Sequence, residues 1–411
     1  MIITLNILLI LALAVFGYRI SHKSDIKAYY WPGLALKIIA GIGLGLLYSY
    51  YYASGDSWVM FNEAIRLADT AFESTSAFSD IYILSNYTSI PDYAYVLQPR
   101  AAFMTKIIAL PSSFTSDNYW LVSCYLSMFS FFGFWFAANI IYNNFGNKTT
   151  AVLPALFFPS IVFWSSGILK ESIAISSLAV AMTILIDTYY KKRAGWLNTL
   201  LLIGSILFLL YLKYYYAAIL IVSFITVFFI RALLSKTSNR YIELGSIVIV
   251  FFSILGIASL FHPNFWPSRF LTVITDNYHS FIDNSSEENV VKFKSLTPTI
   301  TSLLYYSPKA LFAGLFFPLT IESFNFLKMA SVLENWLVLF SFIYAVRLFR
   351  IPELRDDRLL LWAILLFVIT TAVFITFSTP NLGTLARFKI GYWVVFVTLI
   401  TGVITNRIKA T

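Results

Sequence analysis

Charged residues are scarce in this sequence. Only 12% of its 411 residues are Asp, Glu, Lys or Arg, against roughly 25% in ordinary soluble domains, and 59% are hydrophobic. Cysteine and histidine are scarcer still. A single cysteine, Cys124, excludes a disulfide within the chain, and three scattered histidines argue against a zinc centre. The composition therefore indicates an all-α protein that crosses a membrane many times.

Nucleotide-binding motifs are also lacking. The sequence has no glycine-rich loop of the kind that cradles phosphate and no dinucleotide fingerprint, which argues against a nucleotide-sugar donor. The net charge of +9 could suggest nucleic acid as a partner. In a membrane protein, however, the location of the charges matters more than their sum. We therefore place the spans before we interpret the charge.

Apolar runs predict a single transmembrane domain over 1–411, a helical bundle of about eleven spans. The expected spans are 2–18, 33–53, 118–142, 150–166, 172–190, 196–212, 215–234, 242–260, 331–347, 359–378 and 388–405. As one helix, 196–234 would be nearly twice as long as the roughly 30 Å of the hydrocarbon layer at about 1.5 Å per residue. The chain is therefore expected to turn near Lys213.

Two long polar loops, 54–116 and 261–330, separate these spans and are expected to carry interfacial helices. One set of loops holds 17 of the 29 Lys and Arg residues but only 6 of the 20 Asp and Glu residues. That set includes Lys37. The positive-inside rule makes the basic side cytoplasmic, so both long loops are expected to face outward. The excess positive charge then needs no nucleic-acid partner.

The stretch Gly55-Asp56-Ser57-Trp58 leads from the second span into a helix with one charged and one apolar face, which predicts a helix on the membrane surface. Asp56 has two interpretations. It could cap this helix by accepting amide hydrogens of the first turn, although Ser57 is an equally good cap. Alternatively, its carboxylate could act as a general base that takes a proton from an acceptor hydroxyl.

Lys170 and Glu171 open the helix that follows a proline-kinked span ending at Ser165-Ser166-Gly167. The positive end of a helix favours Glu171 there, but it disfavours Lys170. An anionic ligand would explain the lysine. The ordinary alternative is a lysine that reaches toward lipid head groups.

Two more basic motifs lie at the predicted outward boundary. Arg387, followed by Lys389, offers a guanidinium fork suited to phosphate, and ordinary lipid phosphate is the simpler partner. Lys213 lies beside the aromatic run Tyr214-Tyr215-Tyr216, which could equally be a belt of interfacial tyrosines. Each motif therefore has a structural and a functional interpretation.

Acidic residues accompany these cations, because Glu322 and Glu334 precede the ninth predicted span. Glu334 could instead pair with Lys328 or cap the span. As catalytic residues we predict Asp56, Glu171 and Glu322. As substrate-binding residues we predict Arg100, Lys170, Lys213, Arg387, Lys389, Trp58, Trp164, Tyr214, Glu63, Glu334 and Asn381. No metal centre is predicted, although Asp56 with Glu171 or Glu322 could bind a divalent cation.

This arrangement resembles that of the C-type integral-membrane glycosyltransferases, the group with the GT-C fold. The shared features are an aspartate that opens a surface helix in the first long outward loop, a second outward loop late in the chain, and a basic residue near the end. The acid here follows the second span and stands beside Ser57, whereas that group more often has it after the first span with a second acid. Three short motifs also look like segments of uncharacterised bacterial polysaccharide-assembly proteins: Phe157-Phe158-Pro159-Ser160, Trp164-Ser165-Ser166-Gly167 with Lys170-Glu171, and Asn381-Leu382-Gly383-Thr384 with Arg387.

The resemblance implies that Asp56 acts as the base and that the donor is a polyprenyl-phosphate-linked sugar. The expected reaction is an inverting transfer to a glycan or lipid acceptor at the outer face of a bacterial inner membrane. One alternative is an O-antigen or exopolysaccharide polymerase that uses a lipid-pyrophosphate-linked glycan. Another is a glycolipid flippase or transporter, which should show repeated halves and charges at span centres. The sequence instead gathers its ionisable groups at one face.

Overall fold

The computed structural model describes residues 1–52, 55–191, 195–233, 240–261, 266–320, 326–349 and 358–410. Regular structure in these ranges is helical, and a single isolated β-bridge joins Val290 and Asn381. Seven of the described helices are long and apolar enough to cross a membrane, or eight if one bent pair counts as a span. The protein is therefore all-helical and of the multi-pass membrane type.

The seven long apolar helices are α1 (Ile2–Ser21), α2 (Tyr30–Tyr50), α6 (Tyr119–Phe145), α9 (Lys170–Lys191), α10 (Trp196–Leu233), α14 (Phe326–Leu348) and α15 (Arg358–Ser378). The bent pair is α16 (Leu382–Phe388) with α17 (Ile390–Ala410), which meet at 62°. The remaining α-helices are α3 (Asp56–Ala71), α4 (Thr75–Phe78), α5 (Pro99–Thr115), α7 (Lys148–Val152), α8 (Pro159–Trp164), α11 (Arg240–Phe261), α12 (Pro267–Asp283) and α13 (Ile300–Phe316).

The expected count of eleven spans is not confirmed, and a first reason lies in the predicted span 150–166. This stretch consists of α7, a π-helical turn over Leu153–Phe157, and α8. Pro154 and Pro159 interrupt it because proline has no amide hydrogen and its ring clashes with the preceding turn. The stretch is therefore broken rather than one continuous span.

Three more predicted spans lie in α10 and α11. The predicted spans 196–212 and 215–234 correspond to the two helical segments of α10, which are separated by a kink where the backbone leaves the helical region at Lys213 (φ −148°, ψ 67°). The expected interruption near Lys213 is thus confirmed. The predicted span 242–260 falls within α11 (Arg240–Phe261), a helix of 22 residues.

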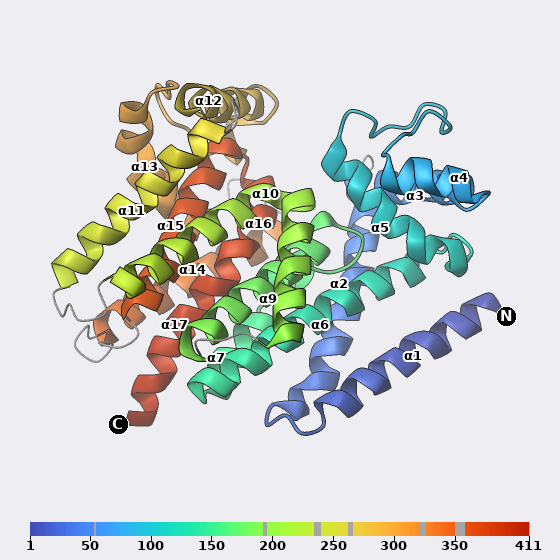
Figure 1. Cartoon of the computed structure of the whole chain (residues 1–411), viewed down its shortest axis with the longest axis horizontal. Coiled ribbons are helices and arrows are strands. Elements are labelled where there is room, and N and C mark those ends of the chain that lie inside the picture. Colours follow the sequence, from blue (N-terminus) through green and yellow to red (C-terminus); the bar gives the residue numbers. More distant parts are fainter. Residues whose placement is uncertain are drawn as a thin grey trace. The chain divides into compact units, whose positions relative to one another are not determined.

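The chain divides into two compact units, one formed by 1–187 with 194–214 and the other by 188–193 with 215–411. In the first unit, α2 packs along α6, and α3 packs against α5. Figure 1 shows α3 running across the direction of α2. Met60, Phe61 and Leu67 of α3 are buried while Asp56 and Asp69 are exposed, which confirms the amphipathic helix expected after Asp56.

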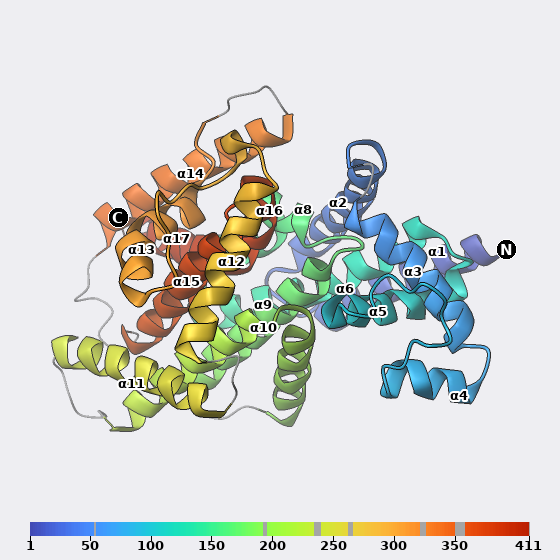
Figure 2. The ribbon, with the colours of Figure 1, turned by 90° about the horizontal axis from the view of Figure 1, so that it is seen from above.

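In the second unit, α15 packs against both α13 and α17, and α14 packs against α17 (Figure 2). The amphipathic helix α12 contacts α15 and crosses it near one end (Figure 1). An ion pair joins α11 to α15, with Arg358 Nε and Nη2 each 2.7 Å from the carboxylate of Glu243. The charge distribution of the sequence had assigned these two residues to the same membrane side.

Candidate functional site

The first candidate residue, Asp56, is the first residue of α3 and is exposed. The capping position of α3 is Gly55, one residue before Asp56 and two before Ser57. Ser57 is buried, and its hydroxyl lies 2.6 Å from the hydroxyl of Tyr119. Neither Asp56 nor Ser57 therefore occupies the N-cap position that the sequence suggested.

Gly55 lets the chain pass close to α2 at this point. A Cβ at Gly55 would lie 2.0 Å from the ring of Tyr48, so only glycine fits without a shift of that ring. Tyr48 belongs to a buried cluster with Leu44 and Leu169, and Trp58 and Trp164 pack against this cluster. The start of α3 is thus held beside the segment that joins α8 to α9.

Trp58 itself is fixed by its neighbours. Its ring stacks on Tyr119 with centroids 3.8 Å apart, and its indole NH donates to the carbonyl of Gly45 at 3.3 Å. The residue is half-buried. Trp58 therefore orients the start of α3 whatever else it contacts.

The segment between α8 and α9 leaves helical geometry at Ser165–Leu169. Gly167 has a φ of +65°, a conformation that favours glycine. Ser165 and Ser166 are completely buried, and their hydroxyls bond to carbonyls of the preceding turn. Lys170 and Glu171 then begin α9, as predicted, with Lys170 half-buried and Glu171 only 1% exposed.

Glu171 binds Lys213, and this ion pair links the start of α9 to the interruption in α10. The Lys213 ammonium lies 2.9 Å from Glu171 Oε1, and both side chains are almost fully buried. Tyr214 follows Lys213 in the chain. The guanidinium of Arg100 lies over the Tyr214 ring, 4.6 Å from the ring centroid. Both Arg100 and Tyr214 are exposed. Four predicted site residues thus meet around the interruption in α10.

These contacts place the start of α3, the start of α9 and the Lys213 interruption in the same unit of the protein. The chain itself was compared with protein-family models, curated proteins and solved structures. No match was found. Any functional conclusion therefore depends on the residues themselves and their geometry.

Glu63 anchors a neighbouring loop to α3. Its carboxylate lies 2.7 Å from Arg66 Nη1 and accepts a hydrogen bond from the Ala94 amide at 3.1 Å. The loop carries Tyr95, which is buried. Burial, and then the negative charges of Asp56 and Glu63, raise the pKa of Tyr95 to about 12. A neutral phenol therefore lies near Asp56 at physiological pH, a feature that the sequence analysis did not identify.

In the second unit, Asn381 has an evident structural role. Its side chain caps α16 by accepting from the Thr384 amide at 3.0 Å, and its amide donates to Ser285 Oγ at 2.9 Å. The amide of Val291 donates to the carbonyl of Pro380 at 2.9 Å. The second polar loop is thus bound to the motif that precedes Arg387, which is itself half-buried.

Lys389 lies in the interior rather than at an exposed mouth. It has no exposed surface, and its ammonium bonds to Asn335 Oδ1 and, at 3.3 Å, to the carbonyl of Phe317. The same ammonium lies 3.6 Å from the centroid of Trp393. Glu334, next to Asn335 on α14, is also buried. These contacts tie α14, α17 and the end of α13 together.

Two predicted features cannot be placed. Glu322, and Ser54 beside the Gly55 motif, lie outside the described residues. Within the ranges that are described, no group of three or more His, Cys, Asp or Glu residues is arranged to hold a metal ion.

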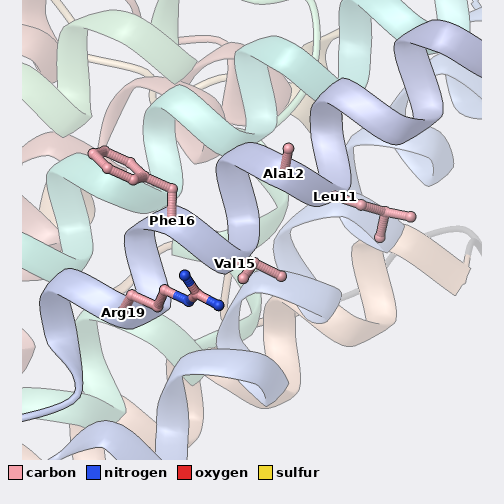
Figure 3. A pocket seen from close by; sticks show the side chains of 5 residues that line it. All are labelled: Leu11, Ala12, Val15, Phe16 and Arg19. Carbon is pink, nitrogen blue, oxygen red and sulfur yellow. The ribbon is translucent and has the colours of Figure 1, made fainter.

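A hollow on the surface of α1 is not a candidate site. Figure 3 shows that its five lining side chains, Leu11, Ala12, Val15, Phe16 and Arg19, all come from this one helix. The lining is apolar except for Arg19, and most of α1 is exposed. Such a surface is ordinary for a helix that faces lipid.

Proposed function

We propose that the chain is an inverting membrane glycosyltransferase that takes a sugar from a polyprenyl-phosphate-linked donor. The observation that carries this proposal is the presence in one unit of an exposed carboxylate, Asp56, together with basic residues at the start of α9 and at the interruption in α10. Lys170 adjoins the cluster that holds α3, and Arg100 lies over Tyr214 beside Lys213. An exposed acid suits proton transfer, and nearby cations suit a phosphate.

The proposed reaction uses these groups in one displacement. The hydroxyl of a glycan or lipid acceptor attacks the anomeric carbon of the donor sugar and loses its proton to Asp56. The bond between that carbon and the phosphate oxygen breaks, and polyprenyl phosphate leaves with the electron pair. Fixed cations stabilise the charge that develops on the leaving phosphate, which is usually the largest single contribution in such chemistry.

The residues divide into three roles under this proposal. Arg100 and Lys170 bind the phosphate in the first unit. Arg387, which belongs to the second unit, is a separate candidate ligand for phosphate. Tyr214 and Trp164 line the path of the sugar or lipid, and Tyr214 is exposed enough to do so. Glu171 is paired with Lys213, so it serves the site by holding that cation in place. Asp56 remains the base because it is the exposed acid next to the cluster.

A glycolipid flippase is the second candidate, because one specific observation favours it. The first unit contains the interruption of α10 at Lys213, the non-helical segment before α9, and a buried ion pair between Lys213 and Glu171 that connects them. Discontinuous helices with charged groups at the breaks are typical of transporters. A polymerase that uses a lipid-pyrophosphate-linked glycan would instead share the transferase chemistry with a longer donor.

Donor cleavage separates these candidates. The purified protein in lipid nanodiscs should convert a polyprenyl-phosphate sugar, labelled in the sugar, into free polyprenyl phosphate and a labelled product. A flippase would move the intact glycolipid across a bilayer without cleaving it. A polymerase would leave this donor intact and consume its pyrophosphate-linked counterpart.

We expect Arg387→Ala to weaken the binding of polyprenyl phosphate about tenfold or more, since a charge-assisted contact contributes about 1.5–3 kcal/mol. Arg387→Lys should restore only part of the affinity, because an ammonium cannot reproduce the guanidinium fork. Arg19→Ala is the matched control, as this arginine lies in the last turn of the exposed helix α1. If the parent and both Arg387 variants bind polyprenyl phosphate with equal affinity, Arg387 is not a ligand of the phosphate.

The proposal also places the active face outward in a bacterial inner membrane, with the N-terminus and both long loops outside and the C-terminus inside. In a Cys124→Ser background, an impermeant thiol reagent applied to intact spheroplasts should label Asp283→Cys but not Lys148→Cys. Both positions are exposed on the protein. Labelling of Lys148→Cys alone would reverse the orientation and, with it, the proposed site of transfer.

A further inference from the structure

Lys37 is an ionisable side chain deep within a membrane helix. At about 1.5 Å per residue it lies about 10 Å from the first residue of α2 and about 20 Å from the last. Only 2% of the residue is exposed. Lys37 was counted with the charges of the cytoplasmic loops, but it lies within α2 and not in a loop. An ionisable group at this depth is costly and needs partners there.

The partners of Lys37 lie in the non-helical segment between α8 and α9. Its ammonium donates to the carbonyl oxygen of Ser165 at 3.0 Å and also to the hydroxyl of Ser165. The centroid of the Phe134 ring lies 4.5 Å from the same nitrogen. Ser130 donates a second hydrogen bond to the Ser165 carbonyl at 2.6 Å. The Lys37 amine is therefore bound to oxygens of Ser165 and not to a carboxylate.

The break in the helix explains why this carbonyl needs donors. Where a helix ends, its last carbonyls lose their partners within the helix, and a membrane interior offers no water to replace them. Lys37 from α2 and Ser130 from α6 supply the missing donors to Ser165. On the other side of the break, Ser127 accepts a hydrogen bond from the Gly167 amide at 2.9 Å. Polar side chains thus hold the break from both neighbouring helices.

We infer that Lys37 is a positioning residue for Lys170 and Glu171. By binding the Ser165 carbonyl it fixes where the chain leaves α8, and this sets where α9 begins with these two residues. Lys37 is too buried to touch a substrate in the aqueous phase. The inference rests on the proposed function only in that Lys170 and Glu171 are taken to serve the transfer site.

Amide hydrogen exchange in nanodiscs tests the positioning directly, because it requires no substrate. In Lys37→Met, which removes the donor but keeps much of the shape, amides of 165–171 should exchange about tenfold faster or more, as expected when local opening becomes easier. Lys37→Arg, which keeps the charge and the donors, should exchange at nearly the parental rate. Lys148→Met, a change at an exposed lysine of α7, is the control. Parental exchange in Lys37→Met would overturn the inference.

Ser130→Ala keeps the test decisive if Lys37→Met does not fold. It removes the other donor to the same carbonyl and should accelerate exchange in the same peptide to a smaller extent. Parental exchange in Ser130→Ala would then overturn the inference. Acceleration confined to 165–171, with α1 unaffected, would support it.

Kinetics connect the positioning to the reaction. With a polyprenyl-phosphate sugar as donor, Lys37→Met should lower kcat about a hundredfold, because a displacement of about 1 Å can cost that much, and Lys37→Arg should recover most of it. Equal loss of kcat in both variants would contradict a positioning role. If the parent protein itself transfers no sugar, the proposed function fails, and the exchange measurement alone decides the role of Lys37.

Discussion

Asp56→Asn should lower the rate of sugar transfer by about two to four powers of ten, because a neutral amide cannot accept the proton of the acceptor hydroxyl. The change keeps the shape of the side chain, and the amide oxygen can still accept a hydrogen bond from the first turn of α3, which begins after Gly55. Binding of polyprenyl phosphate should survive, as the proposed phosphate ligands are the basic residues. Transfer rates from a labelled donor, measured at saturating acceptor, provide the test.

Asp69→Asn is the matched control for this prediction. Asp69 is an exposed acid on the same helix, so the substitution removes the same charge from the same surface. The two variants should have similar thermal stability, and only the Asp56 variant should lose transfer. An Asp56→Asn protein that works at the parental rate would exclude Asp56 as the base.

Glu171→Gln should lower the free energy of unfolding by about 3–5 kcal/mol, the usual cost of leaving a buried charge without its partner. The Lys213 ammonium would lose the carboxylate that now lies 2.9 Å away, in a place where both side chains are almost fully buried. Lys213→Met should have a similar cost for the same reason. Denaturant titration in mixed micelles measures the free energy of unfolding of both variants.

The double variant Glu171→Gln, Lys213→Met should recover much of this loss, because it leaves neither charge buried alone. The exposed pair Glu287–Lys292, with side chains 88% and 50% exposed, is the control, and Glu287→Gln should have little effect on unfolding. Additive losses in the double variant would show that the two residues act independently. That result would contradict an energetic link between the start of α9 and the interruption in α10.

Composition and periodicity predicted the fold class because they report directly on burial in lipid. The long helices α1, α2, α6, α9, α14 and α15 coincide with predicted spans. The count of eleven spans is not confirmed, because an apolar run need not be one uniform helix. Hydropathy treats 150–166 as continuous, although Pro154 and Pro159 divide it, whereas the length of 196–234 was enough to predict the break at Lys213.

Candidate site residues could be chosen from the sequence, since ionisable residues beside long apolar runs are visible there. The structure brings Glu171 to Lys213 and Arg100 to Tyr214, and their roles stay a prediction. Lys389 was misplaced because the sequence cannot distinguish a cation at a mouth from one that bonds to Asn335 inside the bundle. Lys37 was overlooked for the opposite reason: its position within an apolar run was the signal, and it was counted with the loop charges instead.

The most direct test of the central claim is to follow a polyprenyl-phosphate sugar, labelled in both the sugar and the lipid, in proteoliposomes that contain only this protein and an envelope glycan as acceptor. The account predicts that the two labels separate and that free polyprenyl phosphate appears at the rate at which the acceptor gains sugar. Asp56→Asn should abolish this separation of the labels, whereas Asp69→Asn should not. Movement of the doubly labelled donor across the bilayer with both labels still joined would contradict it and identify a flippase.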